Sequence, residues 1–439
     1  MGDAARLAAQ QNGVIDAARA QVEQASARAD LSKSALFPDL SAGAVQQKHT
    51  LNTATFGFSF IDPSTGQPLM RPDGEILGPV PTIDFRYRVQ AQIYNPSLWG
   101  NWRAAQAGTA AASANLEAQA EGVAAAAALS YVAAARAQAQ LEARAADSAL
   151  AADLLRIARD QLDAGVGVAL DVTRAQSQLA NVRAQIIMAR NERDRTLLEL
   201  RRVTGMPIDA PLELADSLAG MPVEDLPAAG NAAGNAEASA AATATYREQR
   251  VSSALSTALD KRPDLRALDA LEAVQEQSGK AIRMERMPQL SLTLDHGVIG
   301  ANTKRLLPTY SWGLALSMDI FDGYRRKARL EEQLAAVRET EARLRDLRAQ
   351  SSLEVRSALL DLDAAREQVD AAAERLTLAN QEVSQAEDRF EAGVSGNADV
   401  ITALLSLNQA RTLRNDALAA YQMARVALAR AMGEARQLP

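Results

Sequence analysis

Apolar and polar positions along the chain follow two different periods, and both periods occur in each half of the sequence. In residues 83–94 every second residue is apolar, while those between are Asp, Arg, Arg, Gln, Gln and Tyr. Residues 290–295 and 314–320 alternate in the same way. A period of two predicts β-strands. With a weaker pattern near residue 40, we expect four strands, at about 38–48, 82–95, 288–297 and 309–322.

These strands would carry one apolar and one strongly polar face, which allows two interpretations. A soluble sheet with one solvated face shows the same alternation. Strands of about ten residues with several Arg and Gln on one face also fit a membrane barrel with a water-filled interior, and we favour this second reading. Single-chain barrels start at eight strands, and lipid does not tolerate open sheet edges. Four strands in one chain would therefore have to be pooled by several chains.

Long Ala-rich stretches without proline predict a helical hairpin in each half. Residues 102–163 and 324–391 would each form an arm of roughly 90–100 Å at the rise of an α-helix. Apolar residues recur with a 4,3 spacing in 330–390 and in the returning arm 172–203. A sustained period of 3.5 is typical of coiled-coil packing. Alanine at many of these positions would let the helices approach closely.

A glycine-bearing break interrupts each hairpin, and the two breaks are copies of one another. Residues 162–172 and 390–400 share Ala-Gly-Val and Asp-Val at a constant offset (393 − 165 = 228 and 399 − 171 = 228). Such a break between two helical patterns predicts the tip of a hairpin. Asp171 and Asp399 fall where the returning helices start, and we expect each to be an N-cap whose carboxylate accepts from backbone N–H groups.

The chain therefore reads as two repeats. The first covers 1–206 with its hairpin at about 101–205, and the second covers 251–439 with its hairpin at about 324–433. Residues 207–250, which contain a Gly/Pro-rich run, are expected to be a linker or equatorial region. A shorter helical pattern precedes the strands of each repeat. It is broken at Asn12-Gly13 in the first and at Arg262-Pro263 in the second.

Composition and motifs exclude several classes of protein. The net charge is −7 and no block of Lys and Arg supports nucleic-acid binding. The chain has no cysteine, which rules out disulfides and thiolate metal sites, and no apolar run long enough for a transmembrane helix. No secretory leader is expected. His49 and His296 lack partners at ligand spacing and are expected to be incidental. We therefore expect no catalytic site, no cofactor and no metal site.

The order helix, strand, strand, long hairpin, given twice, resembles the TolC-like outer-membrane efflux protein family. This family supplies the outer-membrane factor of tripartite efflux or type I secretion systems. The resemblance rests on the two tip breaks and on four further motifs, which are Phe37-Pro38-Asp39-Leu40, Met287-Pro288-Gln289-Leu290, Arg262-Pro263-Asp264-Leu265 and Asp319-Ile320-Phe321-Asp322-Gly323. Asn12-Gly13 departs from it, because the family commonly has Asn-Pro there.

The resemblance implies a mainly α fold with a β-barrel part. A homotrimer would pool its strands into one 12-stranded transmembrane barrel among the lipids of the bacterial outer membrane. An α-helical coiled-coil barrel would continue it into the periplasm. The tips would meet a periplasmic adaptor (membrane fusion) protein that links them to an inner-membrane pump. The candidate docking and channel-entrance residues are Gly165, Gly167, Leu170, Asp171, Gly393, Gly396, Asn397 and Asp399.

Charged residues beside the tips have two readings. They could form ion pairs between chains that hold the entrance closed, or they could be a solvated coiled-coil face. These residues are Arg156, Arg159, Asp160, Asp163, Arg174, Glu387, Asp388 and Arg389.

The predicted function is that of a passive exit duct that performs no chemistry. The rival is a soluble periplasmic coiled-coil adaptor or scaffold, which would have long hairpins but would not need four amphipathic strands. An enzyme is the third and most distant possibility.

Overall fold

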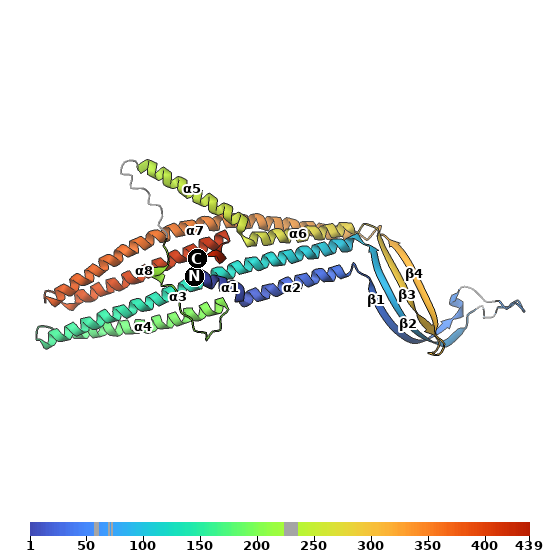
Figure 1. Cartoon of the computed structure of the whole chain (residues 1–439), viewed down its shortest axis with the longest axis horizontal. Helices are drawn as coiled ribbons and strands as arrows, with labels where there is room; N and C mark the ends of the chain where they lie inside the picture. The colour runs from blue at the N-terminus through green and yellow to red at the C-terminus, as the bar shows by residue number, and fades with distance from the viewer. Residues whose placement is uncertain (57–60, 69–70, 72, 224–235) are drawn as a thin grey trace. The chain divides into compact units, whose positions relative to one another are not determined.

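The structure is a computed structural model that describes residues 1–56, 61–68, 71, 73–223 and 236–439. The helices are α1 (Gly2–Gln11), α2 (Gly13–Ser34), α3 (Pro96–Asp163), α4 (Ala169–Thr204), α5 (Ala236–Lys261), α6 (Pro263–Met284), α7 (Arg325–Glu391) and α8 (Asn397–Met432) (Figure 1). The strands are β1 (Asp39–Asn52), β2 (Ile76–Tyr94), β3 (Gln289–Gly300) and β4 (Leu307–Ser317).

The backbone divides into two compact units, and each takes segments from both halves of the sequence. One unit consists of Met1–Glu23, Ala110–Ala270 and Thr340–Pro439, and the other of Gln24–Thr109 and Leu271–Glu339. The first contains both hairpin tips, and the second contains all four strands. The two repeats are therefore interleaved in space, because strands pair with strands and hairpins pack on hairpins.

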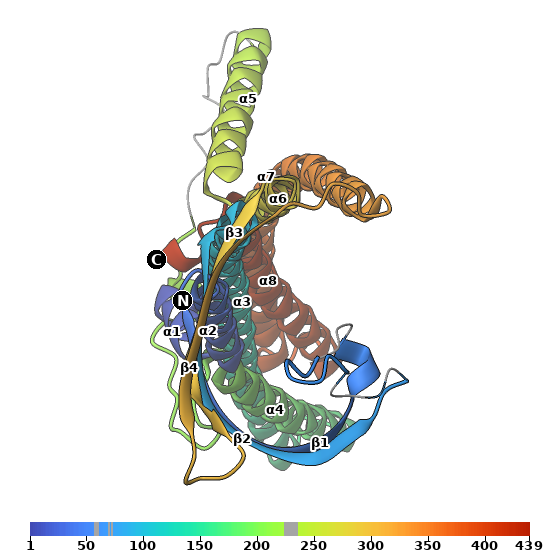
Figure 2. The ribbon, with the colours of Figure 1, turned by 90° about the vertical axis from the view of Figure 1, so that its right-hand side faces the viewer.

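The four strands form one antiparallel sheet in the order β1-β2-β3-β4, and Figure 2 shows that this sheet is curved. The pairing of β2 with β3 joins the two repeats, with Arg88 opposite Asp295. β1 and β4 each pair on one side within the chain. A single copy thus presents two open edges.

Three strand ends differ clearly from the expected positions. β1 continues to Asn52, although we expected it to end near residue 48. β2 begins at Ile76, although Pro79 and Pro81 suggested a loop there. β3 ends opposite Ile83, so residues 76–82 of β2 pair with β1 alone. This part of β2 is an edge strand, and an edge strand tolerates proline. β4 ends at Ser317 instead of near residue 322. Ser317 pairs with Gln289, the first residue of β3, so no partner strand continues beyond it.

The sheet separates its side chains into a polar and an apolar face. On the polar face the guanidinium of Arg86 binds the carboxylate of Asp84 at 3.0 Å and also pairs with Asp295. On the other face Leu40, Val89, Leu294 and Trp312 form one row across all four strands. The side chains at the two ends of this row are 71% and 67% exposed. The apolar face is therefore left uncovered in a single chain.

The cores between the hairpins are built mainly from alanine. Ala151 and Ala158 of α3, Ala175 of α4 and Ala410 of α8 are almost completely buried in one cluster near the tips. The 4,3 pattern predicted in the second long arm is confirmed over 355–390, where alternate seam positions are buried: Val355, Ala358, Ala365, Ala372, Ala379, Val383 and Phe390. Nearer the sheet the pattern is less closely packed, and Leu334 is 39% exposed. Small side chains let the four helices of the two hairpins pack closely near the tips.

The expected linker is more ordered than its composition suggested. Helix α5 already begins at Ala236, since the Ala-rich stretch that follows the Gly/Pro-rich run has high helix propensity. Before the run, Leu218 and Met221 pack against Tyr131 and Leu418. The Nε2 of Gln422 donates to the carbonyl of Pro222 at 3.0 Å. The run itself, 224–235, lies outside the described residues.

The breaks that precede the strands make the same backbone contact in both repeats. The Nδ2 of Asn12 donates to the carbonyl of Val203 at 2.7 Å, near the end of α4. In the second repeat Arg262 donates to the carbonyl of Ala431 at 3.4 Å, near the end of α8. The two carbonyls are separated by the offset of the repeat (431 − 203 = 228). Each break is therefore tied to the end of its own returning helix.

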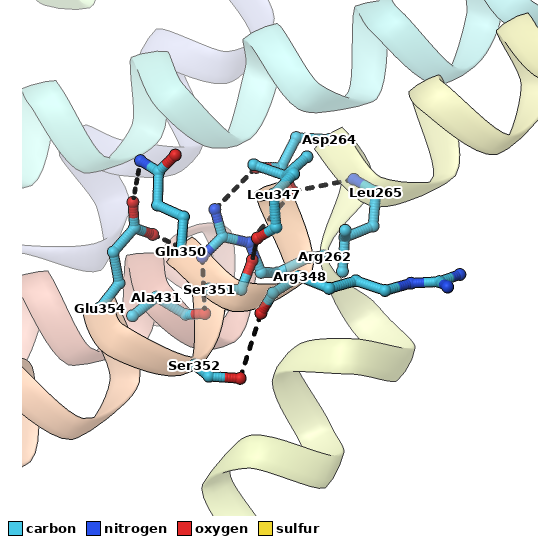
Figure 3. Close-up of polar contacts among 10 residues, drawn as sticks. All are labelled: Arg262, Asp264, Leu265, Leu347, Arg348, Gln350, Ser351, Ser352, Glu354 and Ala431. Atoms are coloured by element: carbon cyan, nitrogen blue, oxygen red, sulfur yellow. Dashed lines mark hydrogen bonds and ion pairs between the residues drawn. The ribbon is translucent and has the colours of Figure 1, made fainter. Parts of the chain in front are cut away.

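The break of the second repeat is held by a charged side chain, Arg262, whereas that of the first is held by the neutral side chain of Asn12. Figure 3 shows the contacts of Arg262. Arg262 is buried and binds the carboxylates of Asp264 at 2.7 Å and Glu354 at 2.5 Å. Burial opposes the ionisation of Asp264, but hydrogen bonds and charge from Arg262 outweigh it and hold the pKa of this carboxyl below its usual value. Arg262 thus joins α6, α7 and α8 at one point.

We expect Arg262→Met to lower the free energy of unfolding by about 2 kcal/mol, because it removes charged hydrogen bonds to two carboxylates and one carbonyl. Arg348→Met is the control, since the side chain of Arg348 is half exposed and pairs with Asp269 at 3.7 Å, a contact of little value. Thermal unfolding in detergent, followed by circular dichroism, measures both. Equal unfolding temperatures for the two variants would contradict the role given to Arg262.

Candidate functional site

Both hairpin tips close with the same backbone motif. Gly165 follows the end of α3 with φ 74°, and Gly393 follows the end of α7 with φ 69°. The N–H of Val166 donates to the carbonyl of Gln161 at 3.0 Å, and the N–H of Val394 to that of Arg389 at 2.9 Å. This is the Schellman arrangement, in which the residue after the helix is left-handed. A side chain at either glycine would have open space, so the backbone conformation alone accounts for glycine.

The two tips differ at the second residue after the left-handed glycine, which is Gly167 in the first and Ser395 in the second. The N–H of Gly167 also donates to the carbonyl of Gln161, at 2.9 Å, and a Cβ at this position would lie 2.9 Å from the backbone nitrogen of Leu162. The second tip has Ser395 at the equivalent position, and its N–H is 3.3 Å from the carbonyl of Arg389. The second tip therefore accommodates a side chain where the first is too tight for one.

The expectation that Asp171 and Asp399 are N-caps is wrong. The N-caps of α4 and α8 are Val168 and Gly396, and neither is accompanied by a capping side chain. Both aspartates lie three residues further, inside the first helical turn, so their side chains cannot take the cap position. Their negative charge still lies at the positive end of the helix dipole. The glycine-bearing turn uses fewer residues than we expected, so the helices begin earlier.

The structure brings two candidate residues together across the tips. The Nδ2 of Asn397 donates to the backbone carbonyl of Asp171 at 2.7 Å. A second hydrogen bond runs in the opposite direction, from Nε2 of Gln161 in the first hairpin to the carbonyl of Phe390 in the second, at 3.1 Å. Asn397 is completely buried, and among the described residues its Oδ1 has no hydrogen-bond partner. The two tips of one chain are thus held together by two side-chain hydrogen bonds.

Apolar side chains at the tips point outward, and the sequence reasoning missed most of them. Val166 is 80% exposed, Val394 72% and the candidate Leu170 54%. In a Schellman motif the residue after the glycine is frequently apolar and packs on the preceding turn. The motif could therefore have pointed to Val166 and Val394 as apolar tip residues, but it did not predict that they would be exposed. Val168 is also exposed beside Leu170. The tips therefore present a small apolar surface above a tightly packed base.

Three of the charged residues near the tips, Arg156, Asp160 and Arg174, form ion pairs within their own helices. Arg156 lies 3.7 Å from Asp153 and 3.5 Å from Asp160, and all three are exposed on α3. Arg174 lies 3.7 Å from Asp171. On α7 partial burial raises the pKa of the Glu387 carboxyl, and neighbouring carboxylates add to the effect. Whether these charges also pair between chains remains a hypothesis.

Searched over the described ranges, none of the helices is sufficiently long and apolar to span a bilayer.

The comparison with known proteins agrees with this architecture. The family described as "Outer membrane efflux protein" matches residues 4–206 and 254–434. The chain belongs to this family. Protein CyaE of Bordetella pertussis is 27% identical over 266 residues, which are 58% of this chain and 50% of CyaE. The chain therefore spans about half the length of this curated relative.

Solved outer-membrane channels share the fold. The Campylobacter jejuni CmeC channel is 18% identical with a TM-score of 0.77, over 99% of this chain and 85% of that chain. The Vibrio cholerae outer membrane protein VceC is 17% identical with a TM-score of 0.74, over 98% of this chain and 95% of that chain. The family match confirms the predicted family and agrees with the prediction that the protein is not an enzyme. The solved structures confirm the mainly α fold with a small sheet. The family and the fold place the protein in the bacterial outer membrane with a periplasmic extension, and neither supports the soluble adaptor.

We expect Gly165→Ala and Gly393→Ala to destabilise each tip locally by about 1–2 kcal/mol, because an L-residue is strained at positive φ. Amide hydrogen exchange at Val166 and Val394 should speed up by roughly five-fold or more. Gly396→Ser is the control, since the φ of Gly396 is −79° and its surroundings leave room for a side chain. Unchanged exchange in both alanine variants would show that the left-handed turn is not required.

Proposed function

We propose that three copies of this chain form one exit duct for efflux or secretion. Their strands make a 12-stranded barrel in the outer membrane, and their hairpins extend it into the periplasm as a helical tunnel. The observation that carries the proposal is the sheet of a single copy. Its edge strands β1 and β4 are open, and its apolar face, with Leu40 and Trp312, is exposed. In lipid every backbone group must be paired, so such a sheet has to close with other copies.

The polar face then becomes the wall of a water-filled passage. Its charged residues are arranged in opposite pairs, since Arg86 binds both Asp84 and Asp295. Arg88 stands opposite Asp295 in the register of β2 and β3. Because these positive and negative side chains neutralise one another, the wall would bind neither cations nor anions tightly. This supports a passive route in which solutes are moved by a partner and not by this protein.

The hairpin tips are the surface that we propose for docking the periplasmic adaptor, which in turn connects to an inner-membrane pump. Gly165, Gly167, Leu170, Asp171, Gly393, Gly396, Asn397 and Asp399 form or border this surface. Exposed Val166 and Val394 supply apolar contact area, which usually contributes most to a small interface. The open space at Gly165 and Gly393 allows a partner backbone to come close. The acidic residues of the first turns then narrow the entrance.

The barrel is tested by placing a charge on either face of one strand. We expect Leu314→Arg to abolish trimers and outer-membrane insertion, because arginine facing lipid near the membrane centre costs about 2–4 kcal/mol in each chain. Ala315→Arg is the matched control, since the adjacent residue faces the polar side with Ser291. Trimers are measured by native mass spectrometry of membrane extracts. A soluble scaffold would tolerate both variants, and that result would remove the proposed duct.

The docking role is tested on the apolar tip residues. We expect the double variant Val166→Asp with Val394→Asp to form normal trimers but to lose adaptor binding and export. Ile61→Asp is the control, because Ile61 is equally apolar and exposed but lies in the β1–β2 connection. Cross-linking to the adaptor in cells and export of a pump substrate are the two readouts. Full export by the double variant would exclude the tips as the docking surface.

A further inference from the structure

We propose that the β3–β4 turn binds the phosphate groups of a phosphorylated glycolipid in the outer leaflet of the membrane, through Lys304 and Arg305. This inference rests on the proposed barrel. It concerns a surface on the far side of the strands from the helices, which the exit-duct function does not use.

The direction of the strands places this turn outside the cell. All four helix connections lie at one end of the sheet, since α2 leads into β1, β2 into α3, α6 into β3 and β4 into α7. The turn between β3 and β4 lies at the opposite end. If the helices extend into the periplasm, the turn emerges in the outer leaflet.

The apolar face of the sheet ends just below the turn. Along β3 that face runs from Leu290 to Val298, which is about 26 Å at the rise of a strand. The apolar band of a membrane barrel is about 25 Å tall. Because strands in such a barrel are tilted by about 40°, this stretch rises only about 20 Å, and two further residues, to Gly300 at the end of β3, bring the strand to the edge of the band. The turn that follows Gly300 therefore lies at the level of the lipid head groups. Tyr310, an exposed aromatic on the apolar face of β4, lies five residues after Arg305 of the turn.

The basic side chains of the turn are free to bind a ligand. Asn302 shapes the turn, because its Oδ1 accepts from the N–H of Lys304 at 3.1 Å and its backbone carbonyl from the N–H of Arg305 at 3.2 Å. Both side chains are exposed. Within the described part of the chain, neither forms an ion pair with a carboxylate. Two adjacent cations without acids suit a phosphate group.

A third cation, Lys48, lies at the same end of the sheet. Lys48 is eight residues from Leu40 in β1, with regular pairing between them, so both side chains face the lipid side. It pairs with Pro81, two residues beyond the position where β3 ends. Three of the acids described at this end, Asp62, Asp73 and Glu75, belong to the β1–β2 connection, which begins beyond Asn52. A fourth, Asp84 of β2, lies on the polar face and binds Arg86. Cations thus border the apolar face where lipid phosphates would lie.

The test measures binding of diphosphorylated lipid A to purified trimers in detergent by native mass spectrometry. Each cation near an anionic lipid surface contributes roughly a factor of five, so Lys304→Gln with Arg305→Gln should weaken binding roughly 30-fold. The control is Arg28→Gln with Arg247→Gln, which removes two exposed cations from helices α2 and α5 and should leave binding unchanged.

Dephosphorylated lipid A should bind the unmodified trimer at least as weakly as the phosphorylated lipid binds the double variant, which keeps Lys48, and added salt should weaken only the phosphorylated complex. If the double variant forms no trimers, these two measurements on the unmodified protein decide the matter. Trimers that bind both lipids equally, or a double variant within twofold of the unmodified protein, would overturn the inference alone. A chain that remains a monomer without detergent would instead overturn the proposed duct.

Discussion

The pairing of backbone groups in the sheet is the constraint on which the rest of the molecule depends. A sheet whose apolar face lies in lipid has no water to satisfy an open edge. One copy contributes the order β1-β2-β3-β4 and leaves an edge at each end. In the proposed trimer, copies of the same chain would pair these edges with one another.

The four strands and two hairpins of one chain come from two copies of the same structural repeat. Each repeat supplies two strands and one hairpin, and the pairing of β2 with β3 unites the repeats in the membrane part. In the periplasmic part the two repeats are joined by the alanine-rich cores between their hairpins. Alanine brings helix axes close but buries little area per residue, so stability has to come from the length of the contact. Helices of 68 and 67 residues, α3 and α7, provide that length.

The two repeats keep the same backbone contacts and differ in their side chains. At the breaks that precede the strands, Asn12 and Arg262 reach equivalent carbonyls, but only the arginine also binds carboxylates on α6 and α7. At the tips the same turn contains Gly167 in one copy and Ser395 in the other. The second hairpin is thus anchored at its base by charge, whereas the first is anchored by a neutral amide. A trimer built from such chains has six hairpins of two alternating kinds.

Local sequence determined much of this protein. The period of two defined the strands and the 4,3 spacing defined the long helices, because both patterns reflect which side of an element is buried. Gly165 and Gly393 marked the tips, since a left-handed residue is a local requirement. Tertiary structure alone decided what lies far apart in the chain. It brought Asn397 to Asp171 and Gln161 to Phe390, contacts that span 226 and 229 residues. It extended β2 past two prolines because only β1 pairs with it there, and it left Val166 and Val394 uncovered. No local pattern contains that information, because each of these outcomes depends on a neighbour that the sequence does not place.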